Sequence, residues 1–149
     1  NTTIAAATGG ISVFLIRYLL TKKYDVGGLC NGVLAGLVSI TAGCGNVESG
    51  SAFLIALVGA VVYQASSVLL VRLRIDDPVD ASCVHGACGI WGLLAAALFD
   101  WGSGFGYFHG WGGWSCTEAS PGMCNTDAAG GKAIAVNLLM AIVIMLWAG

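Results

Sequence analysis

Charged side chains are scarce in this sequence of 149 residues. Six Lys and Arg and eight Asp and Glu make up 9% of the chain, and the formal net charge is −2. Soluble domains carry roughly 25% charged residues. Because six scattered basic residues cannot form the cationic surface that nucleic acids require, the composition argues against a nucleic-acid partner.

The motifs of common catalytic chemistry are also lacking. The sequence contains no Gly-rich phosphate loop, no nucleophile elbow and no pair of carboxylates in a setting that would support catalysis. We therefore expect that the chain is not an enzyme and that it needs no cofactor.

Hydrophobic residues, by contrast, make up 57% of the sequence. They gather in runs of roughly 17 to 25 residues, the length that spans a bilayer. This pattern predicts an all-α, polytopic transmembrane helix bundle, embedded in membrane lipid as a single domain over residues 1–149. About five membrane-spanning helices are expected, at about 4–20, 26–44, 51–73, 78–99 and 132–149, with a loop at about 100–131. Because the sequence starts with Asn and stops inside an apolar run, we also expect a fragment of a longer protein.

Two sets of glycines recur at helical spacing. Gly28, Gly32 and Gly36 lie four residues apart, which lines one face of a helix with small residues and lets another backbone approach. A second set, in the 78–99 segment, recurs every three residues and comprises Gly86, Gly89 and Gly92. Helix packing is the favoured interpretation of this second set, and the wall of a conduit is the alternative.

The basic residues predict how the helices are oriented. Loops rich in Lys and Arg stay in the cytoplasm. With alternate crossings, five of the six basic residues fall at one side, namely Arg17, Lys22, Lys23, Arg72 and Arg74. We therefore expect an external start, an external loop at 100–131 and a cytoplasmic C-terminal end.

His85 is an ionisable residue within one of the apolar runs. A helix that begins at Pro78 would place it roughly 10 Å into the membrane. Ionisable residues at such a depth are costly and are functional by default. A buried neutral imidazole can both give and accept a proton, which suits a proton relay or a polar position in a narrow pore. The alternative is a structural histidine that bonds between helices.

Three carboxylates precede this histidine, at Asp76, Asp77 and Asp80. Negative charge suits a helix N-terminus, and Asp77 can act as the N-cap. Asp80 falls within the expected first turn, where it must find hydrogen-bond donors from another segment. For Asp80 we favour a structural role over direct contact with a substrate.

The six cysteines do not predict a metal site. Cys83 and Cys88 flank His85, but a helix spreads the three side chains over different faces, so they cannot converge on one ion. Cys30 and Cys44 are expected to be small buried hydrophobes, and His109 an interfacial residue rather than a ligand. For Cys116 and Cys124 in the external loop, a disulfide and two free thiols are equally plausible.

Several blocks of the sequence resemble a known family. Asp76–Pro78 followed by Val84–Gly92, read as VHGACGIWG, resembles the late signature of ammonium transporters of the Amt/Mep/Rh superfamily. The resemblance extends through Asn1–Thr3 and through Asn31–Cys44. It covers about the first 100 residues and the last segment, whereas the loop at 100–131 departs from the family.

The resemblance implies a fold and a function. Members have about eleven crossings in two inverted halves and form homotrimers, usually in the plasma membrane, with a pore for ammonium or ammonia in each subunit. The five segments here look like the last five crossings. By similarity, His85 is the second of two pore histidines, and its partner lies outside this sequence. Leu34 and Ala81 would line the apolar conduit, and Asp77 and Asp80 would organise the inner end of a helix.

Two other functions fit the same residues. One is an ammonium sensor that uses this fold to signal to partners. The other is a membrane-embedded metal or redox protein that uses His85 with Cys83 or Cys88. Transport of ammonia and transport of ammonium both remain open.

Overall fold

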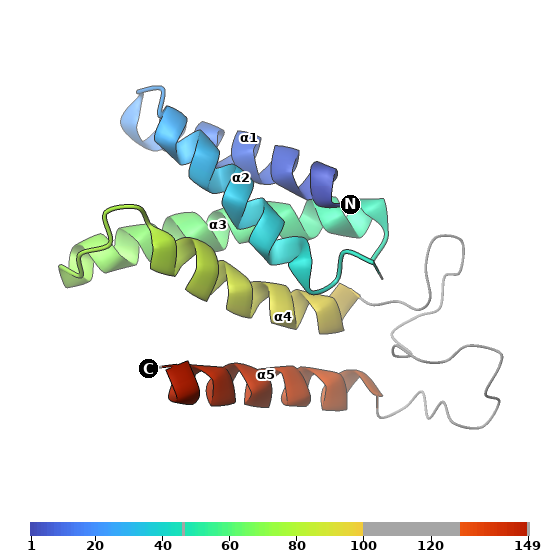
Figure 1. The fold of residues 1–149 in the computed structure, drawn as a ribbon. Coiled ribbons are helices and arrows are strands. Elements are labelled where there is room, and N and C mark those ends of the chain that lie inside the picture. The colour runs from blue at the N-terminus through green and yellow to red at the C-terminus, as the bar shows by residue number, and fades with distance from the viewer. Residues whose placement is uncertain (46, 100–128, 149) are drawn as a thin grey trace.

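A computed structural model describes residues 1–45, 47–99 and 129–148, and it is helical throughout, with no strand in these ranges (Figure 1). The helices are α1 (Thr2–Thr21), α2 (Val26–Thr41), α3 (Ser49–Leu73), α4 (Cys88–Phe99) and α5 (Ala129–Ala148). A π-helical turn, η1 (Ser82–Ala87), leads directly into α4. The expected all-α fold is confirmed.

The helices lie side by side with their ends alternating. Figure 1 shows the α1–α2 and α3–η1 connections at one end, and the N-terminus, the start of α3 and the end of α4 at the other. The first end carries Lys22 and Arg74, the residues at which α1 and α3 stop. The basic residues expected to share one side therefore do lie at one end of the bundle.

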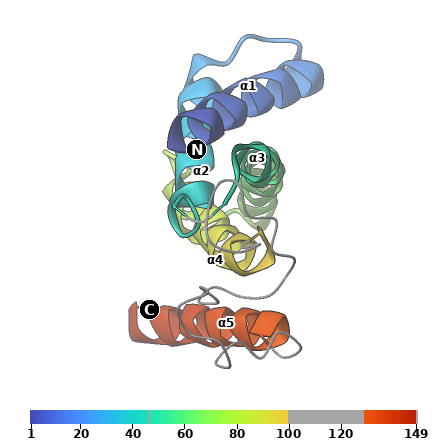
Figure 2. The same ribbon diagram turned by 90° about the vertical axis from the view of Figure 1, so that its right-hand side faces the viewer.

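Helix α5 is set apart from the others. It lies below α4 in Figure 2, and among the described elements it packs on α4 alone. The side-chain amide of Asn137 donates to the Leu93 carbonyl at 2.7 Å. This bond satisfies the interior polar residue of an otherwise apolar helix.

Three of the helical stretches are long and apolar enough to cross a membrane. They are Thr2–Thr21, Ser49–Leu73 and the continuous stretch Ser82–Phe99, whereas Val26–Thr41 and Ile134–Trp147 are shorter apolar helices. Helix α2 stops at Thr41 rather than near residue 44, because the chain turns there and the Gly43 amide donates to the Ile40 carbonyl. The expected number of helices is thus confirmed, with three reaching full spanning length within the described residues.

The predicted helix start at Pro78 is wrong, because the helix begins at Ser82. The Asp80 amide donates to the Asp77 carbonyl at 3.1 Å, which closes a turn with Pro78 in its second position. Aspartate followed by proline favours such a turn. His85 therefore lies three residues into the helix, and the depth counted from Pro78 does not hold.

The seam between α1 and α2 depends on glycine. A Cβ at Gly36 would meet the Ala5 carbonyl oxygen, and one at Gly32 would lie 2.7 Å from the Gly9 carbonyl oxygen. Such contacts allow the two backbones to approach directly. The packing role expected for Gly32 and Gly36 is confirmed.

One buried cluster connects α1, α2, α3, η1 and the start of α4. Its members are fully buried or nearly so, and they are Val13, Ala35, Ala60, Tyr63, Cys83, Val84 and Cys88. Because η1 contributes one side of this cluster, the opposite side of η1 faces away from the bundle core.

The glycine seam predicts a specific stability effect. Gly36→Ala should lower the free energy of unfolding by about 1–3 kcal/mol, because the added methyl group overpacks the α1–α2 contact. Thermal unfolding in detergent would measure the change. Gly50→Ala is the control, since no atom lies within 4 Å of a Cβ at that position. Equal melting temperatures for the two variants would contradict the seam.

Candidate functional site

His85 projects from the exposed side of η1. It is an exposed residue in this chain, whereas Cys83, Val84 and Cys88 are at most 2% exposed. Its imidazole makes no hydrogen bond to any residue that the structure describes. No described element covers that side of η1, and the burial of His85 within the membrane stays a prediction.

The π-helical geometry of η1 is unusual in itself. Such turns occur mostly as single bulges within α-helices, frequently at functional sites. Just before η1 the spacing is still that of an α-helix, because the Val84 amide donates to the Asp80 carbonyl four residues earlier, at 2.9 Å. Within η1, Cys83 is buried and His85 is exposed.

The glycines that follow His85 serve two purposes. A Cβ at Gly92 would lie 2.9 Å from the Ser39 carbonyl oxygen, so this glycine packs α4 against α2. No atom lies within 4 Å of a Cβ at Gly86, which is exposed beside His85. The packing interpretation is confirmed for Gly92 and is wrong for Gly86.

Leu34 and Ala81 are exposed, like His85. Leu34, which is 45% exposed, precedes Val38 by one helical turn, and the Val38 side chain lies 3.9 Å from the Cβ position of Gly89. Leu34 therefore lies on the side of α2 that borders η1 and α4. Ala81 immediately precedes η1. We call Leu34, Ala81, His85 and Gly86 the α2–η1 face.

Two further cysteines differ from expectation. Cys30 and Cys44 are exposed rather than buried. Cys30 precedes Leu34 by one turn of α2, so it shares the exposed side of that helix. The sequence could not reveal this, because apolar residues on a membrane helix face lipid, protein or a pore alike.

Asp77 caps the helix that carries His85. Its carboxylate accepts hydrogen bonds from the amides of Ala81, at 2.9 Å, and Ser82, at 2.8 Å. Desolvation opposes ionisation, but these amide bonds hold the pKa of the Asp77 carboxyl below its usual range. The carboxylate is therefore charged at neutral pH, next to the positive end of the helix dipole.

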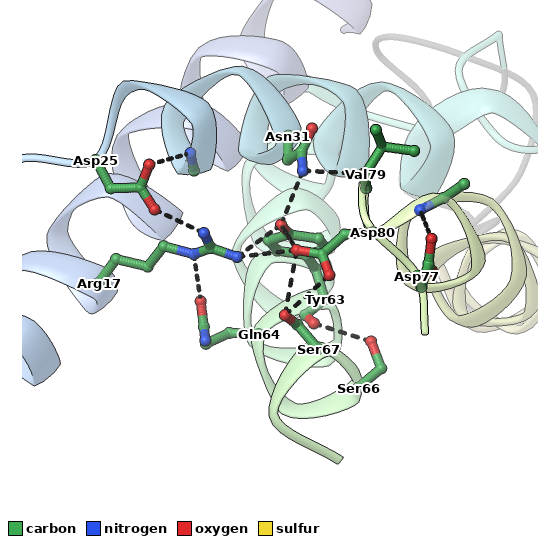
Figure 3. A network of polar contacts seen from close by, with 12 residues as sticks. Arg17, Asp25, Asn31, Tyr63, Gln64, Ser66, Ser67, Asp77, Val79 and Asp80 are labelled. Carbon is green, nitrogen blue, oxygen red and sulfur yellow. Dashed lines mark hydrogen bonds and ion pairs between the residues drawn. The ribbon is translucent and has the colours of Figure 1, made fainter. Parts of the chain in front are cut away.

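Asp80 ties this helix start to two other helices (Figure 3). Its Oδ2 atom accepts from the Tyr63 hydroxyl at 2.6 Å and from Arg17 Nη2 at 3.0 Å. The Ser67 hydroxyl lies 3.2 Å from both carboxylate oxygens. The donors that the sequence required for Asp80 thus come from α1 and α3.

Arg17 is the centre of the same network. Besides Asp80, its guanidinium donates to Asp25 at 2.6 Å, to the Tyr63 hydroxyl at 2.8 Å and to the Gln64 side chain at 3.1 Å. Asp25 in turn caps α2, and the hydrogen bond from Arg17 holds the pKa of this carboxyl below its usual range. One side chain of α1 therefore reaches the α2 cap, α3 and the turn before η1.

Sequence reasoning missed this role of Arg17. It read the residue only as a marker of the cytoplasmic side. A single arginine before the last turn of an otherwise apolar helix is a usable signal, because a charge at that position needs partners. The identity of the partners has no such signal, since Asp80 is 63 residues away.

The backbone of Asp80 is strained. Its φ angle is 55°, in the left-handed region that few residues other than glycine adopt. Aspartate tolerates this region better than most residues, and the cost is of the order of 1–3 kcal/mol. The bonds from Arg17, Tyr63 and Ser67 offset that cost.

No group of three His, Cys, Asp or Glu side chains that could hold a metal ion occurs within residues 1–45, 47–99 and 129–148. Cys83 and Cys88 are buried while His85 is exposed, so the three do not converge. His109, Cys116 and Cys124 lie outside the described residues, and the disulfide stays a prediction.

Comparison with known proteins identifies the family. The model of the Ammonium Transporter Family matches residues 1–149. The chain belongs to the ammonium transporter family. Because this is a family of transporters, membership supports the expectation that the chain is not an enzyme.

Two curated ammonium transporters show how much of a family member is present. Ammonium transporter 1 member 3 of Solanum lycopersicum is 42% identical over 99 residues, which cover 66% of this chain and 22% of that protein. Ammonium transporter 1 member 1 of Oryza sativa subsp. japonica is 32% identical over 157 residues, which cover 99% of this chain and 28% of that protein. The chain thus spans between a fifth and a third of the length of these relatives.

A solved structure has the same fold over nearly the whole of this chain. The structure described as "Sensor Amt Protein" matches 98% of this chain and 32% of its own chain, with a TM-score of 0.75 and 29% sequence identity. The helix arrangement in Figure 1 is therefore part of a larger known architecture.

The Arg17 network predicts a stability effect at Tyr63. Tyr63→Phe should lower the free energy of unfolding by about 1–3 kcal/mol, because Asp80 loses its shortest hydrogen bond in a partly buried site. Thermal unfolding in detergent would measure it. Tyr24→Phe removes the hydroxyl of a residue that is 75% exposed and should change stability by less than about 0.5 kcal/mol. Similar losses in both variants would count against the network.

Proposed function

We propose that the full-length parent protein transports ammonium or ammonia across a membrane, and that this chain supplies part of its pore wall. The observation that carries the proposal is the α2–η1 face, on which the apolar residues Leu34, Ala81 and Gly86 and the imidazole of His85 are all exposed. An exposed histidine among apolar side chains in a membrane helix needs either a partner or an aqueous path. Membership of the ammonium transporter family supports the same conclusion.

The mechanism follows from the cost of desolvation. An intact ammonium ion loses its hydration in a narrow apolar pore, which costs of the order of several kcal/mol or more, whereas neutral ammonia pays far less. In the proposed mechanism ammonium gives up a proton near the entrance, and ammonia passes along Leu34 and Ala81. The proton moves separately through the two nitrogens of the His85 imidazole and of a partner histidine elsewhere in the parent protein.

Asp77 and Asp80 act on this mechanism indirectly. In the proposal neither contacts the transported species. Asp77 caps the helix that carries His85, and Asp80 anchors the turn before it to α1 and α3. Both therefore organise the inner end of that helix.

The placement in the cell is part of the proposal. The basic end of the bundle lies in the cytoplasm, together with the C-terminal end of the chain, and the loop at 100–131 lies outside. The parent protein forms homotrimers in the plasma membrane, as the family resemblance implies. Grouping of Lys22, Lys23, Arg72 and Arg74 at one end of the helices supports this orientation.

An ammonium sensor is the second candidate. The observation in its favour is the similarity to a solved structure described as "Sensor Amt Protein". A sensor would bind ammonium on the same α2–η1 face but would signal to a partner rather than conduct. Ammonium uptake by cells that express the parent protein and have no transporter of their own separates the two functions.

His85→Ala in the parent protein should abolish most ammonium uptake or change its selectivity against other monovalent cations, while the protein stays in the membrane. The reason is that the methyl group can neither give nor accept a proton at that position. Uptake of labelled methylammonium by cells lacking other transporters would measure the effect. His109→Ala, which removes the other histidine of the chain, is the control and should leave uptake unchanged. Wild-type uptake and selectivity in His85→Ala would refute the relay.

These 149 residues should not conduct when expressed alone. The α2–η1 face is open to its surroundings in this chain, so the pore wall is incomplete. Uptake should return when the rest of the parent protein is co-expressed and the two parts assemble. Ammonium uptake by the chain on its own would show that the face does not need a second wall.

A further inference from the structure

The turn before η1 has few attachments to the rest of the bundle. The Asn31 side chain donates to the Val79 carbonyl at 3.2 Å, and the other side-chain contacts to neighbouring helices converge on the Asp80 carboxylate. Asp80 also starts the helix, because its carbonyl accepts the Val84 amide. Asp80 therefore sets the position of the turn that carries His85 together with the packing of Cys83 and Val84.

Arg17 is suited to hold this carboxylate in one place. Its planar guanidinium reaches three fixed acceptors besides Asp80, on the α2 cap and on α3, at 2.6 to 3.1 Å. The side chains of Arg17 and Asp80 are each 20% exposed, so the pair is largely shielded. The planar guanidinium presents its several donors in fixed directions, so it fixes direction as well as distance, which the flexible ammonium group of lysine cannot do.

We propose that Arg17 is a positioning residue, whose guanidinium fixes Asp80 and thereby holds η1 in the rotation that buries Cys83 and presents His85 on the α2–η1 face. The proposal rests on the proposed function for the use made of His85. The contribution of Arg17 to the rotation of η1 is a separate claim and has its own readout. Arg17 does not contact the transported species.

The buried cysteines of the same helix report on that rotation. Cys83 in η1 is 1% exposed, and Cys88 at the start of α4 is 0% exposed. The Cys88 thiol lies 3.6 Å from the Gly59 carbonyl of α3, so it is held by α4 packing rather than by the Asp80 turn. Release of η1 alone should expose Cys83 and leave Cys88 protected.

The test labels the full-length parent protein in membranes with N-ethylmaleimide and follows each cysteine peptide by mass spectrometry. Arg17→Lys keeps the positive charge but loses the planar guanidinium with its several donors. Asp80→Asn removes the negative charge but keeps a side chain that tolerates positive φ. Both variants should label Cys83 at least about threefold faster than wild type, with Cys88 unchanged. Uptake per molecule in the membrane should fall in both.

Arg72→Lys is the matched control. Arg72 lies at the same end of the bundle, is exposed and makes no hydrogen bond or ion pair within the described ranges. This variant should label and transport as wild type does. If it also released Cys83, the effect would belong to arginines at this end in general, and the proposal would fail.

The remaining outcomes separate the two claims. Wild-type labelling of Cys83 in both variants would overturn the positioning role, even if uptake fell. Parallel labelling of Cys83 and Cys88, or loss of both variants from the membrane, would assign Arg17 to bundle stability and also overturn it. If the two variants showed the expected labelling but the wild-type protein took up no ammonium, the result would support positioning and refute the proposed transport.

Discussion

A carboxylate placed between apolar helices must be surrounded by donors, and this requirement at Asp80 shapes the end of the bundle at which α1 and α3 stop. Removing a charge from water costs several kcal/mol unless it is paired and hydrogen-bonded. Arg17, Tyr63 and Ser67 provide those bonds, so α1 and α3 must bring their side chains to one point. Asp25 then balances the remaining charge of Arg17 and fixes where α2 begins. The crossing of the first three helices and the start of the fourth are thus linked through one small polar cluster.

The sequence was sufficient for the fold class and for the close contacts of α2. Long apolar runs and glycines at four-residue spacing depend on local chemistry, which a single sequence displays directly. The start of the fourth helix was missed, because proline is favoured both in the first turn of a helix and in the second position of a turn. Which residues of this chain cover His85 could not be predicted for another reason: burial depends on which neighbours a chain has. Likewise, nothing in one sequence pairs Arg17 with Asp80.

Glycine serves opposite purposes on two sides of the same helix. At Gly92 the missing side chain lets a neighbouring backbone approach, and at Gly86 it leaves open space beside His85. Both glycines lie in one run with a three-residue repeat, so the repeat alone could not separate them. In a regular α-helix, residues six positions apart already point about 120° away from each other, so a three-residue repeat does not stay on one face.

The π turn also constrains how this region can evolve. A single π turn holds one residue more than the α-helix needs for the same rise. Loss of one residue between Ser82 and Ala87 would restore α geometry and rotate the preceding residues by about 100° relative to α4. Asp77 and Asp80 would then face away from their partners, whatever residues occupied the turn. Chain length in this hexapeptide is therefore fixed more strictly than its composition, and insertions or deletions here should be rarer than substitutions.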